Sequence, residues 1–304
     1  MNVLKPALSS LRMALREHLP AAAQQEPALQ AALRQGAEHP GKLLRGALVA
    51  AAARRHGLSA RSAAALGAAV EYFHTASLLL DDLPCMDDAA VRRGQPCVHR
   101  RHGEATAILA ALALINRAYA LAHGVLAQQP RSVRLRATRL LDRALGVDGL
   151  VGGQAWDLAF ARTVRSPALV SRVALGKTGA LFTLAVLLPA ELARPTRRER
   201  ADLRALCTYW GLLYQLDDDL RDVHAVTPET GKTSNRDRVL ARPNLALALG
   251  SARALARRAR LARQAATVLA RLTARGSRWH YLHQLAAVLA PVPLRAVIPD
   301  HAAA

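Results

Sequence analysis

Helical periodicity runs through almost the whole chain and constrains its fold more than any other feature. Apolar residues recur at three- and four-residue spacing, Ala and Leu dominate, and aromatic residues make up only 4% of the sequence. Ala and Leu are strong helix formers, whereas strands favour β-branched and aromatic residues. Several segments, such as residues 105–115, are apolar nearly all round and therefore belong inside a bundle. We predict an all-α protein, and an all-β architecture is excluded.

Gly and Pro residues mark the ends of most predicted helices. We expect helices over residues 5–18, 26–36, 40–56, 60–82, 103–126, 133–147, 151–163, 168–189, 196–222, 244–270 and 278–290. No stretch is long or polar enough to be an interdomain linker, and no solenoid repeat is present. We therefore expect one large helical bundle, a single domain spanning residues 1–304.

The formal net charge of +20 comes from 42 Lys and Arg residues against 22 Asp and Glu residues. The arginines are spread along the chain, whereas a nucleic-acid site would gather them into a patch. We therefore expect no nucleic-acid partner. An arginine-rich nucleic-acid-binding protein is the alternative hypothesis. Anionic substrates remain compatible with the charge.

Three cysteines without CxxC spacing fit neither a disulfide framework nor a zinc ribbon, so a reducing cytoplasm is the expected location. The N-terminal segment lacks the apolar core of a signal peptide. The longest uncharged apolar stretch, Thr178 to Ala190, is too short to cross a bilayer. We expect a cytoplasmic, soluble protein without a membrane span.

Two clusters of aspartates each follow a strongly apolar helical segment. The first is LLLDDLPCMDD, in which Pro84 ends the helix and the turn can fold Asp87 or Asp88 back toward Asp81. The second is YQLDDDLRD, where Asp218 and Asp222 share one helix face. Carboxylates at a helix C-terminal end repel one another and the macrodipole, so a cation should offset their charge. Magnesium fits, because it takes one or two carboxylates and completes its shell with water and substrate phosphates.

Cationic motifs accompany these clusters. Only four residues are lysines, and three of them stand in the short motifs GKLLR, GKTG and GKT. A lysine kept in an arginine-rich chain indicates a need for a compact point charge. Arg92-Arg93-Gly94 follows the first aspartate cluster, and His74 lies seven residues before Asp81 on the same helix. Aspartates and cations together indicate a metal–diphosphate site.

Six motifs in this order resemble those of the trans-type isoprenyl diphosphate synthases, and most closely the bacterial geranylgeranyl diphosphate synthases. They are HPGKLLRGAL, HTASLLLDDLPCMDDAAVRRGQPCVH, GLVGGQAWDL, GKTGALF, YQLDDDLRD and TGKTSNRD, between about residues 40 and 250. The resemblance implies a helical bundle of the isoprenoid synthase type with a central active-site cavity. It also implies a homodimer with an apolar helix pair at the interface.

The resemblance carries functional roles over to the matching positions. It implies that Mg²⁺, with three ions per active site, is held on an allylic diphosphate by Asp81, Asp82, Asp87, Asp88, Asp218, Asp219 and Asp222. It implies contacts to that diphosphate from Arg92, Lys177, Lys232, Thr178 and Gln215. It implies that isopentenyl diphosphate is held by Lys42, Arg45, His74 and Arg93. Of these residues, Asp81, Asp82, Lys177, Asp218 and Lys232 would be the catalytic ones.

The implied reaction is ionisation of the allylic diphosphate followed by attack of the double bond of isopentenyl diphosphate. Ala76 and Ser77, where farnesyl-making relatives often carry an aromatic residue, are small, and Phe73 one turn deeper could close the tunnel. We therefore expect geranylgeranyl diphosphate (C20), with farnesyl diphosphate (C15) or a non-catalytic partner subunit as alternatives. Phe73 could equally be core packing.

The sequence departs from the family pattern after TGKTSN. Arg236-Asp237 and then Ala241-Arg242-Pro243-Asn244 stand where relatives carry a lysine–aspartate pair and Gly-Lys-x-Thr. Arg could still supply the positive charge. Asp217 is an additional carboxylate that we expect to face solvent or a neighbouring helix rather than a metal. A class I terpene cyclase is disfavoured because the second motif is again aspartate-rich.

Overall fold

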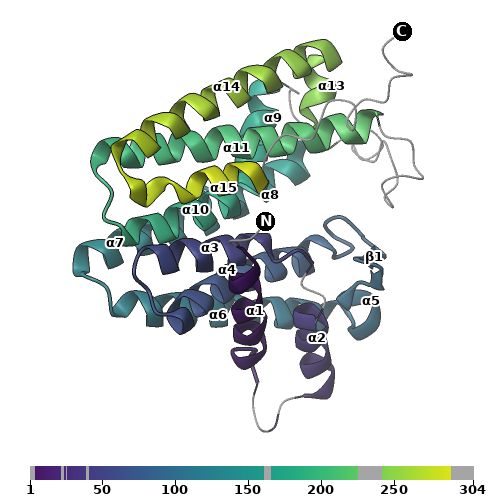
Figure 1. The fold of residues 1–304 in the computed structure, drawn as a ribbon. Helices are drawn as coiled ribbons and strands as arrows, with labels where there is room; N and C mark the ends of the chain where they lie inside the picture. Colours follow the sequence, from purple (N-terminus) through teal and green to yellow (C-terminus); the bar gives the residue numbers. More distant parts are fainter. Residues whose placement is uncertain are drawn as a thin grey trace. The chain divides into compact units, whose positions relative to one another are not determined.

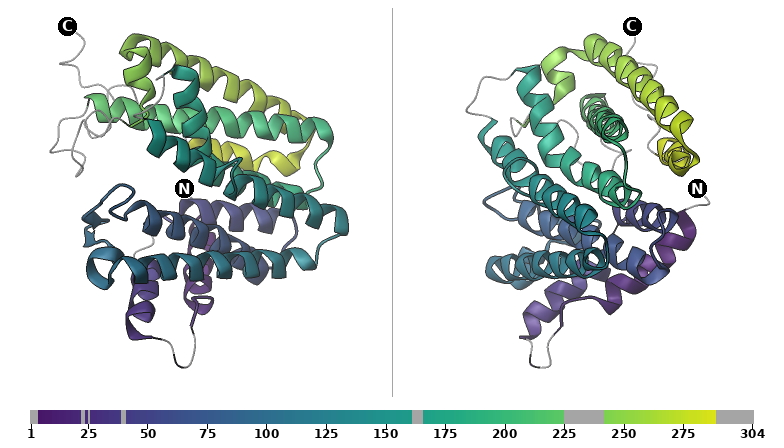
Figure 2. Two further views of the ribbon diagram at one scale, coloured as in Figure 1. Left: turned by 180° about the vertical axis from the view of Figure 1, so that it is seen from behind. Right: turned by 90° about the vertical axis from the view of Figure 1, so that its left-hand side faces the viewer.

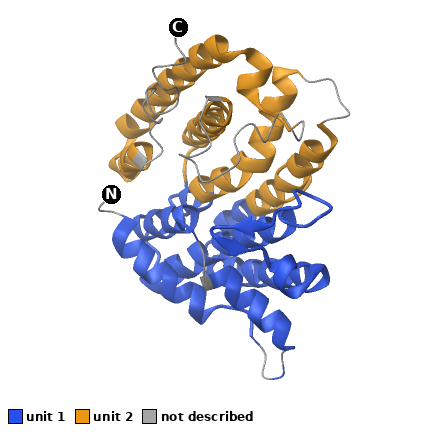
Figure 3. Cartoon of the chain, turned by 90° about the vertical axis from the view of Figure 1, so that its right-hand side faces the viewer, with its two compact units in different colours: residues 1–138, 188–194 blue, residues 139–187, 195–304 orange. Residues whose placement is uncertain are grey.

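The computed structural model describes residues 4–21, 24, 26–38, 41–160, 166–224 and 242–288. The chain forms two compact units, which Figure 3 colours separately. Unit 1 comprises residues 1–138 and 188–194, and unit 2 comprises residues 139–187 and 195–304. Helices dominate the described residues of both units, so the all-α prediction is confirmed. The single domain of residues 1–304 stays a prediction.

Unit 1 is built around one long apolar helix, α4, which packs against α1, α3 and α6 (Figures 1 and 2). The hydroxyl of Ser59 accepts a hydrogen bond from the Ser62 N–H and caps the start of α4, and the helix ends at Asp81, just before Pro84. The elements of this unit are α1 (Leu4–Glu17), α2 (Pro27–Glu38), α3 (Leu44–Arg55), α4 (Ala60–Asp81), β1 (Val91–Arg92), β2 (Gln95–Pro96), α5 (Val98–His102) and α6 (Glu104–Ala127).

Helices α3 and α4 cross at backbone contact. A Cβ on Gly46 would lie 2.7 Å from the carbonyl oxygen of Gly67, and a Cβ on Gly67 would lie 2.5 Å from the carbonyl oxygen of Gly46. Glycine is therefore required at both positions for the helices to approach this closely. The crossing fixes the start of α3, which carries Arg45, against the middle of α4.

Unit 2 contains the long helix α11, which runs alongside α14 (Figures 1 and 2). Its elements are α8 (Leu150–Ala159), α9 (Pro167–Ala174), the π-helical turn η2 (Leu175–Gly179), α11 (Arg197–His224), α13 (Leu245–Leu249), α14 (Ser251–Arg275), the 3₁₀ turn η3 (Ser277–Trp279) and α15 (Tyr281–Val288). Two further helices, α7 (Arg131–Leu145) and α10 (Ala180–Leu192), have residues in both units.

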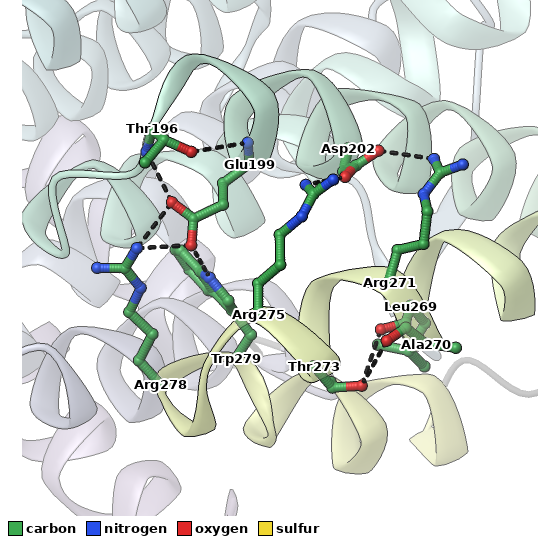
Figure 4. Close-up of polar contacts among 10 residues, drawn as sticks. All are labelled: Thr196, Glu199, Asp202, Leu269, Ala270, Arg271, Thr273, Arg275, Arg278 and Trp279. Carbon is green, nitrogen blue, oxygen red and sulfur yellow. Dashed lines mark hydrogen bonds and ion pairs between the residues drawn. The ribbon is translucent and has the colours of Figure 1, made fainter.

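Ion pairs clamp the start of α11 to the end of α14 (Figure 4). The Glu199 carboxylate accepts hydrogen bonds from the Thr196 N–H at 2.7 Å, Trp279 Nε1 at 2.8 Å and Arg278 Nη2 at 2.5 Å. One turn later, Asp202 pairs with Arg271 and Arg275 of α14 (Figure 4). Burial raises the pKa of Glu199, but these hydrogen bonds outweigh it and hold the pKa at about 2.

The observed helices differ from the predicted ones at turns that local backbone geometry imposes. The helix expected from residue 40 begins at Leu44, because Gly41 and Leu43 both have positive φ angles. The helix expected over 244–270 is interrupted at Gly250, whose φ is +79°. The helix expected over 168–189 contains the π-helical turn η2. Helix α5 and the β1–β2 hairpin were not predicted.

Three helical stretches in the described part of the chain are long and apolar enough to cross a membrane, judged by length and composition alone. They are Ala60–Asp81, Glu104–Ala127 and Pro167–Leu192, whose most apolar windows are 72%, 33% and 72% buried. The first and third are therefore mainly core helices, whereas α6 leaves much apolar surface exposed. Cys85, Cys97 and Cys207 are all free thiols.

Candidate active site

The first aspartate motif of unit 1 forms a compact turn at the end of α4. The Asp87 N–H donates to the carbonyl oxygen of Asp81 at 2.9 Å, and the Ala89 N–H donates to that of Asp82 at 3.2 Å. The turn thus folds Asp87 back toward Asp81, as the position of Pro84 indicated. Asp88, with a φ of +44°, is exposed and pairs with Arg100 at 2.8 Å. The backbone therefore gathers the carboxylate-bearing residues around one helix end.

Asp82 and Arg92 form a partly buried ion pair. Arg92 Nε lies 2.7 Å from both carboxylate oxygens, and Arg92 Nη2 lies 2.5 Å from Oδ1. The Asp82 side chain is only 4% exposed, whereas that of Arg92 is 35% exposed. The structure thus joins a predicted metal ligand to a predicted diphosphate ligand, and the partly exposed guanidinium retains further N–H donors.

The β1–β2 hairpin brings Arg93 to the Gly41 turn. Arg93 and Gly94, with φ angles of +54° and +76°, form the two-residue connection between Arg92 and Gln95. The Arg93 guanidinium carbon lies 2.6 Å from where a Cβ on Gly41 would be. The GKLLR and RRG motifs therefore meet here, at a glycine whose φ is +62°. Lys42, beside Gly41, is exposed.

His74 lies among guanidiniums and is neutral. Burial, reinforced by the positive charges of Arg45, Arg93 and Arg92, lowers the pKa of His74 to about 3. A neutral imidazole leaves the three arginines as the cationic groups of this cluster. Asp82 offsets the charge of Arg92, and a cluster of arginines of this kind attracts an anion such as a diphosphate.

Glu71 of α4 supports the start of α3, a contact that was not predicted from the sequence. Its carboxylate accepts a hydrogen bond from the Gly46 N–H at 2.7 Å and is buried at the start of α3. Leu43, the N-cap residue of α3, makes no side-chain cap, so Glu71 supplies this cap from another helix. Burial raises the pKa of Glu71, opposed by Gly46 and by the charges of Arg45 and Arg93. Glu71 thereby fixes the helix end that carries Arg45.

In unit 2, the second aspartate motif divides into groups with different surroundings. Asp217 is buried and pairs with Arg258 of α14 at 2.5 Å, so it faces a neighbouring helix as expected. Asp218 is half-exposed and pairs with Arg221 at 2.9 Å. Asp222 has a buried Oδ2 atom without a hydrogen-bond partner in the described ranges. A buried carboxylate oxygen without a partner is a candidate ligand for a cation.

Asp219 is held in place by a chain of hydrogen bonds. Thr178 Oγ1 donates to Gln215 Oε1 at 2.9 Å, and Gln215 Nε2 donates to Asp219 Oδ1 at 2.8 Å. The Leu245 N–H donates to Asp219 Oδ2 at 2.6 Å. Three of the predicted site residues are therefore connected, and coordination of a metal by Asp219 would use its remaining lone pairs.

Lys177 and Arg242 share one carboxylate oxygen. Lys177 Nζ lies 2.7 Å and Arg242 Nη1 lies 3.0 Å from Asp157 Oδ2. Arg242 lies in the segment that departs from the expected family pattern, and its guanidinium places a second positive charge beside Lys177. Lys232, the remaining predicted cation, lies outside the described residues.

The donor set fits magnesium, although the described residues of neither unit form a complete cage of protein ligands. Among the described residues, no group of three His, Cys, Asp or Glu side chains is arranged to hold a metal ion by itself. Magnesium needs only one or two carboxylates when phosphate oxygens complete its shell. The all-oxygen donors and the unpartnered Oδ2 of Asp222 agree with this mode of binding. The individual metal roles stay predictions.

The chain-length residues line one side of α4. Ala76 is fully buried, Ser77 is half-buried, and Phe73 is 3% exposed. The ring of Phe73 packs edge-on against Tyr119 of α6, with centroids 4.9 Å apart. Tyr119 was missed because a sequence does not show which residue of α6 faces α4.

Comparisons with known proteins agree with these features. The model of the polyprenyl synthetase family matches residues 26–267. The chain belongs to this family, a family of trans-prenyltransferases. It is 43% identical over 210 residues to a geranylgeranyl diphosphate synthase of Pseudescherichia vulneris, and 40% identical over 212 residues to one of Pantoea ananas. These matches cover 68% of this chain and 66% and 68% of the two relatives, so it spans about two thirds of their length.

Solved structures of similar fold match nearly the whole length of this chain. An FPP/GFPP synthase from Zymomonas mobilis is 31% identical, with a TM-score of 0.78 over 94% of this chain and 97% of that one. A geranyltransferase from Helicobacter pylori, complexed with magnesium and isoprenyl diphosphate, has a TM-score of 0.80 at 24% identity over 95% and 98%. The isoprenoid synthase type of fold is therefore confirmed.

Proposed function

We propose that this chain is a magnesium-dependent prenyltransferase that condenses isopentenyl diphosphate with an allylic diphosphate and makes geranylgeranyl diphosphate (C20). The observation that carries the C20 product is the pair Phe73–Tyr119, which lies one helical turn below the small residues Ala76 and Ser77. Small residues leave room for a growing prenyl chain, and the packed rings form its floor. The names of the two bacterial relatives support the same product.

The residues of unit 1 suit the binding of isopentenyl diphosphate. Arg45 and Arg93 supply positive charge beside the neutral His74, and Lys42 is exposed on the adjoining turn. Neutral His74 would offer a ring N–H or a lone pair without adding to the repulsion among the arginines. The diphosphate would thus be held by cations while the alkene of the substrate remains free to react.

Loss of the allylic diphosphate starts the proposed reaction. The C–O bond breaks, the diphosphate leaves with the electron pair, and the double bond of isopentenyl diphosphate attacks the cation. Loss of a proton to the departing diphosphate restores an allylic product. Lys177 and Lys232 would stabilise the negative charge that develops on the leaving group, and Thr178 and Gln215 would orient it.

Magnesium would be held by Asp81, Asp82, Asp87 or Asp88 in one motif and by Asp218, Asp219 and Asp222 in the other, with three ions per active site. When bound, it supplies Lewis-acid stabilisation of the diphosphate charge. The carboxylates would hold and orient these ions, and Arg92 and Arg221 offset the charges of Asp82 and Asp218 before a cation binds.

We further propose a homodimer that buries the outer face of α6. Ile108, Leu109 and Leu112 are 40%, 54% and 55% exposed and share one side of this helix. Exposed apolar groups in a contiguous patch indicate a protein interface. Size-exclusion chromatography with light scattering tests this: the chain should elute at twice its 32.6 kDa mass, and Leu109→Arg with Leu112→Arg should give monomers. A monomeric wild type would contradict the proposal.

The product assay tests the proposed function. Purified protein is incubated with isopentenyl diphosphate, Mg²⁺ and, in separate reactions, dimethylallyl, geranyl or farnesyl diphosphate, and the dephosphorylated alcohols are identified by mass spectrometry. We expect a C20 alcohol from every primer. A C15 product would retain the mechanism and overturn the proposed floor, and absence of any product would contradict the activity.

A further inference from the structure

The helix that carries Arg45 begins without a cap of its own. The first N–H groups of a helix have no partner within it, and the residue before the helix often supplies an acceptor. Leu43 occupies that position before α3 in a left-handed conformation, with a φ of +52°, and its side chain makes no capping hydrogen bond. The start of α3 therefore depends on an acceptor from elsewhere in the fold.

Glu71 supplies this acceptor from the middle of α4. Its Oε1 atom accepts a hydrogen bond from the Gly46 N–H at 2.7 Å, and the Arg45 N–H donates to the same carboxylate. Arg45 and Gly46 are the second and third residues of α3, the positions that a capping side chain normally binds. The helix macrodipole also favours a carboxylate at this end. A residue 25 positions away in the sequence thus replaces the missing local cap.

Close packing fixes the position of Glu71, which is 2% exposed. A Cβ on Gly46 would lie 2.5 Å from Glu71 Cγ and 2.7 Å from the Gly67 carbonyl oxygen. Glycine at position 46 therefore leaves room for the carboxylate and for the helix crossing together. A buried carboxylate costs free energy unless it is hydrogen-bonded, so the contact favours one arrangement of α3 on α4.

The same carboxylate lies beside two arginines of the cationic cluster. Burial raises the pKa of Glu71, and the Gly46 N–H and the charges of Arg45 and Arg93 oppose that rise. Burial and the charge of Arg92 lower the pKa of Arg93, and the charge of Glu71 opposes this change in turn. Glu71 therefore holds the start of α3 and offsets positive charge at the same place.

The side chain of Arg45 retains a donor for a ligand. Arg45 Nε is buried and has no hydrogen-bond partner within the described part of the chain. A buried donor without a partner is costly, and an anionic ligand would satisfy it. The reach of this guanidinium is set by the helix end from which it extends, and Glu71 holds that end.

We propose that Glu71 is a positioning residue for isopentenyl diphosphate: by capping the start of α3, its carboxylate sets the position from which Arg45 reaches the diphosphate. The proposal rests on the proposed function and deepens it. Glu71 does not contact the substrate in this account; it acts through Arg45. Binding of the allylic diphosphate, assigned to the aspartate motifs and Lys177, uses none of these contacts.

Steady-state kinetics, with each substrate varied in turn, test the role of Glu71. Glu71→Leu, which keeps a side chain of similar size without its oxygens, should raise the KM for isopentenyl diphosphate about 10- to 100-fold and leave the KM for the allylic diphosphate within about threefold. Glu71→Gln should recover most of the loss, because its amide oxygen can still accept from the two N–H groups. An equal loss for both substrates, no loss, or a Glu71→Gln protein no better than Glu71→Leu would overturn the proposal.

Ser59→Ala is the matched control for a general loss of stability. Ser59 caps the start of α4, so this variant also deletes a helix cap from unit 1. It should lower the melting temperature and leave both KM values within about threefold, whereas a rise in the KM for isopentenyl diphosphate equal to that of Glu71→Leu would overturn the proposal. If Glu71→Leu does not fold, Glu71→Asp takes its place: it keeps the charge but is one methylene shorter, so it should raise the same KM while Glu71→Gln does not.

A double-mutant cycle tests whether Glu71 acts through Arg45. Arg45→Ala should itself raise the KM for isopentenyl diphosphate, and the addition of Glu71→Leu should raise it less than about threefold further, because residues that act as a unit are not additive. Independent, multiplicative effects would contradict a positioning role.

Binding of isopentenyl diphosphate alone separates this proposal from the proposed function, because no turnover is needed. Isothermal titration should show binding about tenfold weaker in Glu71→Leu than in wild type. That result with an inactive wild type would retain the positioning role and contradict the synthase activity. Wild-type turnover together with unchanged binding and kinetics in Glu71→Leu would overturn the positioning role only.

Discussion

The guanidinium of Arg92 lies on the carboxylate of Asp82, with Nε 2.7 Å from each oxygen. This pair links the end of α4 to the β1–β2 hairpin, because Arg92 belongs to β1. It also neutralises a carboxylate that would otherwise be buried with its charge unpaired. The first aspartate motif is therefore shaped by an arginine that follows it in the sequence.

Asp82→Asn should reduce kcat by about 100-fold or more, because it removes a proposed metal ligand and the anion that positions Arg92. The magnesium concentration for half-maximal activity should rise as well. Hydrogen exchange of the hairpin amides should become faster, since Arg92 loses its charged partner. Steady-state kinetics across a magnesium titration measure the first two effects, and activity within tenfold of wild type would contradict the assignment.

The second motif contains its own control. Asp218→Asn and Asp222→Asn should each lower kcat by about 100-fold while the protein remains stable. Asp217→Asn should instead retain kcat and lower the free energy of unfolding by about 3 kcal/mol, because Arg258 is left buried without its anion. Urea unfolding and activity are measured on the same three variants. Loss of kcat in a stable Asp217→Asn protein would show that the roles are misassigned.

Much of this site could be predicted from the sequence, because its motifs are local. The aspartates around α4 and α11 and the lysines of the short glycine motifs are adjacent in the chain, so spacing alone grouped them. Contacts between distant segments could not be predicted. Glu71 reaches the start of α3 because Gly46 and Gly67 let α3 and α4 approach closely. Tyr119 contacts Phe73 because of the way α6 is aligned with α4.

The same reasoning explains the differences in the fold. Periodicity shows where a helix forms but not where a positive φ interrupts it, so the late start of α3 and the break at Gly250 were missed. The pairing of Arg242 with Asp157 joins residues 85 positions apart, which no local pattern indicates. The altered segment after TGKTSN thus retains a cation at Arg242.

Phe73→Ala should extend the product beyond C20, because it removes the proposed floor, and Tyr119→Ala should do so through loss of the ring that supports it. Ala76→Phe should shorten the product toward C15. Tyr72→Phe is the control: its hydroxyl donates to the Leu15 carbonyl, so the variant should lose about 1 kcal/mol of stability and keep the product length. Mass spectrometry of the products decides, and an unchanged C20 product in Phe73→Ala would remove Phe73 as the floor.

Glu199 should make unit 2 sensitive to acid. Its pKa in the folded protein is about 2, against an ordinary value of 4.5, so the unfolded state binds more protons between these values. The stabilisation is fully present above about pH 5 and is lost as the pH falls toward 2, and it amounts to about 3 kcal/mol.

Urea unfolding of wild type and Glu199→Gln at several pH values measures this contribution. The difference in free energy of unfolding between the two proteins should be largest above about pH 5 and should shrink toward pH 2. Arg263→Ala serves as a control with no expected pH-dependent difference. A constant difference across this pH range would contradict the ionised state of Glu199 in the clamp.

The most direct test of the central claim is the amount of isopentenyl diphosphate that the wild-type protein adds to farnesyl diphosphate. With Mg²⁺ and excess radiolabelled isopentenyl diphosphate, the account predicts incorporation of one unit per primer, a stop at C20, complete loss on chelation and recovery on addition of Mg²⁺. Absence of incorporation, or continued growth beyond C20 at the same rate, would contradict it.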